Sequence, residues 1–181
     1  MTGESSRSAG GSGPFASGPA EGTSRSYCAF WLGGQCFGVA IELVGELVAV
    51  ESILPVPLAP PAVVGLFSLR GTPVALVDLA VLLDLPAVAR DERKAPLGLV
   101  LRTNDLVASV LIDRMEAVFA SDAKLTRPDD MDEASSPIEG FLEIEGGGGA
   151  VVQVLAEGKL LERLRAIRFR SWALDDALPT G

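Results

Sequence analysis

The residue types that most often carry catalysis or bind metals are scarce in this chain of 181 residues. It contains no histidine, which removes the commonest general base, the commonest metal ligand and the phospho-accepting group of two-component relays. Its two cysteines, Cys28 and Cys36, stand in separate apolar runs without a Cys-x-x-Cys spacing, so a four-ligand zinc site of Cys and His is excluded. We expect two reduced thiols packed in a core, and no metal or cofactor.

Clusters of charge and glycine offer little more chemistry. The acidic residues between 128 and 145 lack the glycine and terminal glutamate of a calcium-binding loop, and Gly146–Gly149 lacks the lysine and Ser/Thr of a phosphate-binding loop. These patterns predict a solvated loop and a hairpin loop, and no catalytic residues. A basic cluster near the end of the chain, which suits a helix C-terminus and predicts a solvated face rather than an anion site, comprises Lys159, Arg163, Arg165, Arg168 and Arg170.

Arg70 is the exception. It is the only basic residue between Arg25 and Arg90, and it stands at a predicted turn between two strongly apolar strands. An isolated guanidinium at such a place either pairs with a nearby carboxylate, such as Glu46 or Asp78, or is presented to a partner. Position alone does not decide between these two roles.

Composition limits the class of partner and the compartment. Fifteen basic and 24 acidic residues give a net charge of −9, which disfavours binding to nucleic-acid phosphates. Apolar residues make up 48% of the chain, but no run approaches the roughly 20 residues that span a bilayer. Residues 1–25 are rich in Gly and Ser and lack the apolar segment of a signal peptide, so we expect a disordered tail and a cytoplasmic protein.

From residue 26 the chain consists of short apolar runs separated by turn residues, the pattern of a mainly β protein. Gly33-Gly34 and Asn104-Asp105 each separate two runs and predict tight hairpins. Five strands are predicted before the polar segment 87–96 and five after it, at 27–32, 35–41, 46–53, 63–69, 73–78, 97–102, 106–112, 116–120, 138–145 and 150–155. Helices are predicted at 79–85, before Pro86, and at 157–168.

The two halves resemble each other. Residues 65–71 followed by 74–77 are similar to residues 140–146 followed by 151–154, and a leucine-rich helix comes next in each case. Five short strands hide their edges by curling into a small barrel. We therefore expect two five-stranded barrels packed together, the first at about 26–90 and the second at 91–168, with a C-terminal tail at 169–181.

Residues 65–71 (GLFSLRG) and 73–79 (PVALVDL) resemble the central signature of the CheW-type chemotaxis coupling proteins, loosely G-x-x-N-L-R-G-x-x-x-P/A-V-x-D-L. The similarity extends, in order and spacing, over about 26–168. Further matching segments are 30–39 (the opening hairpin), 44–47 (V-x-E-I), 55–61 (the proline connector) and 138–141.

The resemblance implies a non-enzymatic adaptor of two SH3-like barrels. Such an adaptor binds the regulatory domain of a CheA-type histidine kinase and the cytoplasmic tip of methyl-accepting chemoreceptors, in a membrane-associated array. By match, the receptor contacts, in the groove between the barrels, are Val44, Glu46, Gly65 and Arg70. The kinase-facing surface is implied to include Val39, Ala40, Ile41 and Leu43.

Departures from the family pattern keep alternatives open. Ser68 stands where the family usually has Asn, and Gly45 replaces a polar or basic residue, which fits a specialised paralogue that binds only one of the two partners. An SH3-like module for proline-rich peptides is disfavoured because such grooves are lined by aromatic residues, which make up 6% of this chain with a single tyrosine. An enzyme or anion-binding domain that uses Arg70 or the basic helix has the least support.

Overall fold

The computed structural model describes residues 24–85, 95–129, 131, 136–144 and 150–167. Residue 25, the last of the predicted N-terminal tail, opens the first strand. The rest of that tail, the C-terminal tail, the Gly146–Gly149 loop and two members of the basic cluster (Arg168 and Arg170) lie outside the described residues. The elements are β1 (Arg25–Leu32), β2 (Gln35–Ala40), the 3-10 turn η1 (Ile41–Leu43), β3 (Val44–Ala49), β4 (Val63–Leu69), β5 (Thr72–Asp78), α1 (Leu79–Leu82), β6 (Leu97–Arg102), β7 (Val107–Ile112), β8 (Arg114–Ser121), β9 (Ile138–Glu143), β10 (Val151–Leu155) and α2 (Glu157–Ala166).

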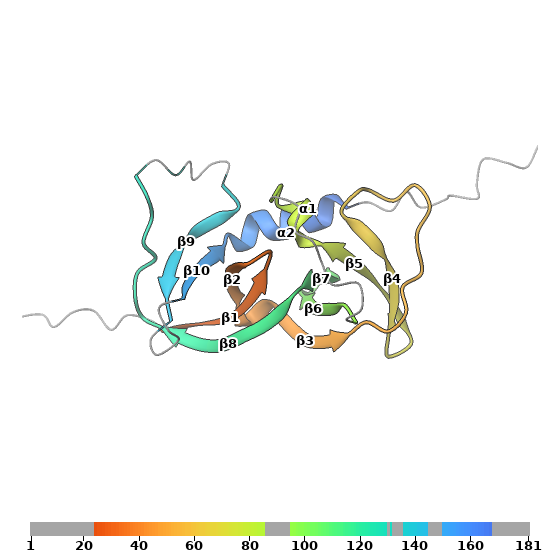
Figure 1. Cartoon of the computed structure of the whole chain (residues 1–181), viewed down its shortest axis with the longest axis horizontal. Coiled ribbons are helices and arrows are strands. Elements are labelled where there is room, and N and C mark those ends of the chain that lie inside the picture. Colours follow the sequence, from red (N-terminus) through yellow and green to blue (C-terminus); the bar gives the residue numbers. More distant parts are fainter. Residues whose placement is uncertain (1–23, 86–94, 130, 132–135, 145–149, 168–181) are drawn as a thin grey trace, which may run out of the picture.

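The strands form two five-stranded sheets that pack side by side (Figure 1). The strand order is β8-β1-β2-β10-β9 in the first, called sheet A, and β3-β6-β7-β5-β4 in the second, called sheet B. Neighbouring strands are antiparallel except for two parallel pairs, β2 with β10 and β5 with β7. The prediction of a mainly β fold with two five-stranded units, a short helix after the fifth strand and a helix after the tenth is confirmed.

The sheets do not follow the predicted division at about residue 90. Sheet B takes β3 to β7, a continuous stretch of chain, whereas sheet A joins β1 and β2 to β8, β9 and β10. Each sheet therefore contains strands from both 26–90 and 91–168. The physical reason is the turn η1, which directs the chain away from β2 so that β3 pairs with β6 in the other sheet.

The predicted similarity between the halves is present in three dimensions. The two strand orders coincide position by position when β1–β5 are matched to β6–β10. Each sheet has one parallel pair at the same position, and each has a β-bulge where its first edge strand pairs with its neighbour, between Val44 and Glu46 in sheet B and opposite Ala29 and Phe30 in sheet A. The chain is thus an interleaved repeat.

The expected closed barrels are not formed. Within the described residues, no ladder joins β3 to β4 or β8 to β9, so the sheets remain open. In the described part of the chain, the backbone pairing across each gap is a single bridge from the segment that follows the edge strand, Leu54 with Leu66 in sheet B and Thr126 with Phe141 in sheet A. The hydrogen bonds of these bridges are 2.7–3.0 Å long. Bridges of one residue bring the connector close to the sheet without closing the barrel.

Two glycines permit that close approach. A Cβ on Gly65 would lie 2.6 Å from the carbonyl oxygen of Leu54, and a Cβ on Gly140 would lie 2.7 Å from the Cβ of Leu125. Both distances are too short for any side chain. These glycines occupy equivalent places in the repeated segments 65–71 and 140–146, so their spacing in the sequence reflects the same packing constraint in both sheets.

The largest apolar core lies between the sheets and is called the central cluster. The inward faces of β1, β2, β6 and β7 supply half of its members, and α1 and α2 cover the junction above them (Figure 1). Each sheet also has a smaller cluster on its other face. The members of the central cluster are Cys28, Phe30, Leu32, Phe37, Val39, Leu43, Ala62, Val77, Leu79, Ala80, Leu83, Leu99, Leu101, Ala108, Val110, Ile112, Leu155, Leu160, Leu161 and Leu164.

Polar contacts hold α2 against both sheets. Arg25 on β1 of sheet A pairs with Glu157 at 3.0 Å, and Arg165 pairs with Asp105, in the turn between β6 and β7 of sheet B, at 2.9 Å. Arg163 donates a 2.6 Å hydrogen bond to the carbonyl of Leu82 at the end of α1. Helix cations that the sequence predicted as a solvated face therefore make specific contacts. The helix thus contacts both sheets.

We expect Gly65→Ala and Gly140→Ala each to lower the free energy of unfolding by about 1–3 kcal/mol, because the new methyl group meets neighbouring chain atoms that cannot move away freely. Gly158→Ala is the matched control, since a Cβ there meets nothing within 4 Å and alanine favours the helix. Urea unfolding measures all three. Equal effects of the three substitutions would contradict the packing role of Gly65 and Gly140.

Asp105 gives a pH-dependent contribution. Arg165 on α2 forms two 2.9 Å hydrogen bonds with its carboxylate, and these, with a hydrogen bond from Thr103, lower the Asp105 pKa to about 2. A lowered pKa stabilises the fold above the unfolded-state value near 3.8, and the effect is lost as the pH falls towards 2. We expect the thermal midpoints of wild type and Asp105→Asn to differ by a constant amount above pH 5 and to converge between pH 4 and 2. A gap that persists at pH 2 would contradict this assignment.

Candidate docking site on sheet B

An ion pair joins the two opposite edges of sheet B. Nη2 of Arg70, in the turn between β4 and β5, lies 2.9 Å from Oε2 of Glu46 on β3. Because β3 and β4 are the edge strands, the pair spans the side at which the sheet stays open. The Arg70 side chain is 80% exposed and that of Glu46 26%. An ion pair this exposed contributes at most about 1 kcal/mol to stability, so folding alone gives little reason for it.

The backbone at Arg70 is strained. Leu69 pairs with Thr72, which leaves Arg70 and Gly71 as a two-residue turn with φ values of 51° and 85°. Positive φ at both central positions is what a type I′ hairpin turn requires, and glycine adopts it more readily than arginine. The hairpin thus holds an arginine at its tip at a conformational cost. Strain of this kind concentrates at functional sites.

The place of Glu46 depends on the bulge at Gly45. Val44 pairs with Leu101 and Glu46 with Val100, so Gly45 is the extra residue. Val44 consequently packs against the central cluster, while Glu46 lies opposite a member of the smaller sheet B cluster. The bulge turns the Glu46 carboxylate towards the β4–β5 turn, where Arg70 pairs with it.

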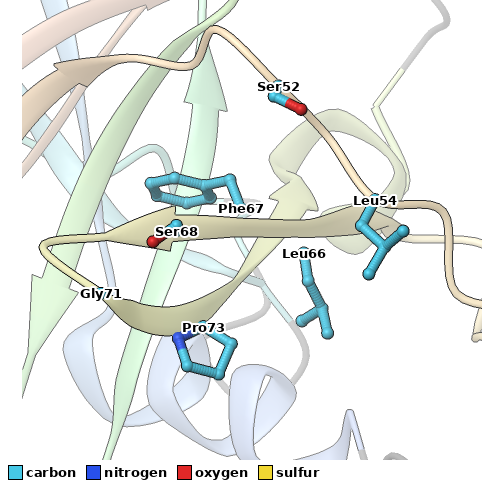
Figure 2. Close-up of a pocket in the computed structure, with 7 residues that line it drawn as sticks. All are labelled: Ser52, Leu54, Leu66, Phe67, Ser68, Gly71 and Pro73. Carbon is cyan, nitrogen blue, oxygen red and sulfur yellow. The ribbon is translucent and has the colours of Figure 1, made fainter.

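A groove of about 360 Å³ lies beside this turn. Figure 2 shows Leu54, Leu66 and Pro73 pointing to the same side of the β4–β5 hairpin, with Ser52 on the connector that crosses it. Leu54 is 67% exposed although it is a large apolar side chain. The full lining is Ser52, Leu54, Leu66, Phe67, Ser68, Gly71 and Pro73. We call the groove together with the Arg70–Glu46 pair the hairpin site.

Sequence reasoning missed this groove. Its lining comes from the proline connector and from two strands that were predicted to be part of a barrel. The available signal was the apolar residue Leu54 beside Pro55, in a segment too rich in proline to form a ladder.

The structure separates the four predicted receptor-contact residues. Arg70 and Glu46 are in direct contact, and both belong to sheet B rather than to a groove between the sheets. Val44 is half-buried against the central cluster, and Gly65 is buried beneath the connector. Of the two roles left open for Arg70, the pair with a nearby carboxylate is present, with Glu46, and presentation to a partner stays a prediction. Its role in receptor binding remains a prediction.

The predicted kinase-facing residues are mostly inside the protein. Val39 and Leu43 belong to the central cluster, and Ala40 is 4% exposed. β2 is also paired on both sides, so its backbone offers no free edge. Only Ile41 is partly exposed. A direct kinase contact through this segment thus remains a prediction for Ile41 alone. The sequence did not reveal this burial, because the apolar pattern of a strand does not show which of its faces a second sheet covers.

The described residues also bear on the metal, thiol and membrane features considered in the sequence. No three Asp, Glu or Cys side chains among them gather where they could hold a metal ion. Both cysteines are free and buried, as predicted, and burial raises the pKa of the Cys28 thiol to about 11, so the reactive thiolate is suppressed at neutral pH. None of the helices in the described ranges is long and apolar enough to cross a bilayer.

Comparisons with known proteins agree with this architecture. The chemotaxis protein CheW of Treponema pallidum (strain Nichols) is 31% identical over 93 residues, 50% of this chain and 55% of the relative, so the chain spans about half the length of the curated relative it matches. The crystal structure of the scaffolding protein TtCheW from Thermoanaerobacter tengcongensis has the same fold, with a TM-score of 0.61 at 19% identity over 74% of this chain and 90% of that chain. The family model for the CheW-like domain matches residues 26–165, and the chain therefore belongs to the CheW-like domain family.

Proposed function

We propose that the protein is a non-enzymatic adaptor that couples methyl-accepting chemoreceptors to a CheA-type histidine kinase in chemotaxis or a related signalling pathway. The observation that carries the proposal is the match to the CheW-like domain over residues 26–165. The names of the relatives, a chemotaxis protein and a scaffolding protein, support the same role. The adaptor works in the cytoplasm and is recruited to membrane-associated receptor arrays.

The proposed receptor contact is Arg70. Glu46 engages one nitrogen of its guanidinium, and the other donors of this 80% exposed side chain face solvent, where a carboxylate of a receptor would accept hydrogen bonds from them. The strained turn and the Glu46 partner hold the guanidinium in one orientation before binding, which reduces the entropy lost on association. The proposed kinase contact lies elsewhere, next to Ile41, so that both partners bind at once.

We expect Arg70→Ala to weaken binding to a receptor-tip fragment by at least about tenfold, because a pre-oriented arginine is a typical hot-spot residue. Its thermal midpoint should change by no more than a few degrees, since the exposed ion pair adds little stability. Arg114→Ala is the matched control, because Arg114 is also exposed and paired with a glutamate, Glu116, but on sheet A. Calorimetric titration measures the affinities.

Four outcomes of these titrations are informative. Binding of both a receptor tip and a CheA regulatory domain to the wild type supports the adaptor. Binding of only one supports the specialised paralogue. The proposal fails if the wild type binds neither fragment, and the assignment of Arg70 fails if Arg114→Ala weakens receptor binding as much as Arg70→Ala.

A further inference from the structure

The connector between β3 and β4 displays a leucine in an unusual conformation. The amide of Ala59 donates to the carbonyl of Val56 at 3.3 Å, which closes a turn with Pro57 and Leu58 at its centre. Leu58 has a φ of 60° and is 97% exposed. Proline followed by a residue of positive φ is the pattern of a type II turn, which favours Gly or Asn at the position of Leu58. The backbone of Leu58 is therefore strained, and its apolar side chain contacts mainly water. A partner that covered this side chain would bury apolar surface without breaking a contact inside the protein.

The same connector lines the groove of the hairpin site through Ser52 and Leu54. A projecting apolar side chain and an apolar groove therefore belong to one edge of sheet B, that of β4. Leu54 and Leu58 are the two most exposed large apolar side chains in the described part of the chain. Isolated exposed leucines are ordinary, but an exposed leucine on the same connector that lines an apolar groove is a candidate protein-binding surface.

The charges around this edge are self-complementary. Residues 52–69 contain no charged residue, although the whole chain carries a net charge of −9. The stretch is flanked by the acidic Glu51 and the basic Arg70, both of which are exposed. Glu46 engages one nitrogen of the Arg70 guanidinium, which has further donors for a second carboxylate. Two copies of the chain thus meet less like charge along residues 52–69 than they would on average over a chain of net charge −9. A two-fold arrangement brings Glu51 of each copy towards Arg70 of the other.

We propose that this edge of sheet B binds a second copy of the chain in a two-fold dimer. Leu58 of each copy enters the groove of the other, and Glu51 faces Arg70 across the axis. The interface is small, so the dimer is weak, with a dissociation constant on the order of tens of micromolar. Because the contact covers Arg70, the dimer and an Arg70-mediated complex with another protein exclude each other.

Sedimentation equilibrium of the full chain from 5 μM to about 1 mM tests the proposal. The wild type should dimerise, and Leu58→Asn should weaken the dimer by at least about tenfold without lowering the thermal midpoint, because asparagine adopts positive φ more readily than leucine. Val118→Thr is the control, since Val118 is 61% exposed but lies on β8 of sheet A. This control should dimerise like the wild type.

A charge reversal tests the orientation. Glu51→Lys should weaken the dimer because it places two cations opposite each other, whereas Glu162→Lys, the same change on an exposed position of α2, should not. A wild type that stays monomeric at 1 mM overturns the proposal, as does dimerisation of Leu58→Asn or Glu51→Lys with wild-type affinity. The experiment contains no receptor or kinase, so its outcome is independent of the adaptor role.

Discussion

The fold depends on burying one apolar core that neither sheet can cover alone. Among the described residues, the central cluster has 20 buried members, against six in each of the clusters on the outer faces of the sheets. Its members come from both sheets and from both helices. The chain passes from sheet A to sheet B and back, so sheet A is assembled from two separate stretches of chain. Separating the sheets would expose leucines that each contribute about 1.5–3 kcal/mol on burial. Surfaces on the two sheets are therefore held at a fixed distance and orientation, as an adaptor requires.

Because the central core holds the sheets together, their outer edges need not be closed. In sheet B the remaining gap is spanned by one backbone bridge and by the Arg70–Glu46 pair, both of which leave polar and apolar groups accessible. The departures from local rules gather at this edge. Of the three non-glycine residues with positive φ in the described ranges, Leu58 and Arg70 both belong to it. Local strain that a stable core tolerates is a common sign that a segment is used for binding.

Local features of this fold were predictable from the sequence, and long-range pairings were not. Gly33-Gly34 forms the expected hairpin turn, with positive φ at both residues, and Asp78 caps α1 at its predicted start. The repeated segments predicted a real structural equivalence, and Arg70 stood out by its isolation. The interleaving was missed because the apolar pattern of β3 is the same whether it pairs with β2 or with β6. The burial of Val39, which was predicted to lie on the kinase-facing surface, was missed for a related reason. In sequence, a strand buried on both faces has the same apolar run as a strand with one buried face and one apolar binding face.

Native-state hydrogen exchange measures most directly whether the two sheets are one cooperative unit. The amides of Phe37 on β2 and Val110 on β7 report on sheet A and sheet B, respectively. The account predicts equal opening free energies for the two, and an equal decrease of about 2–5 kcal/mol in both for Leu160→Ala, which leaves a cavity in the shared core. Exchange of one sheet through a separate opening of lower energy, or a decrease confined to one sheet, would contradict it.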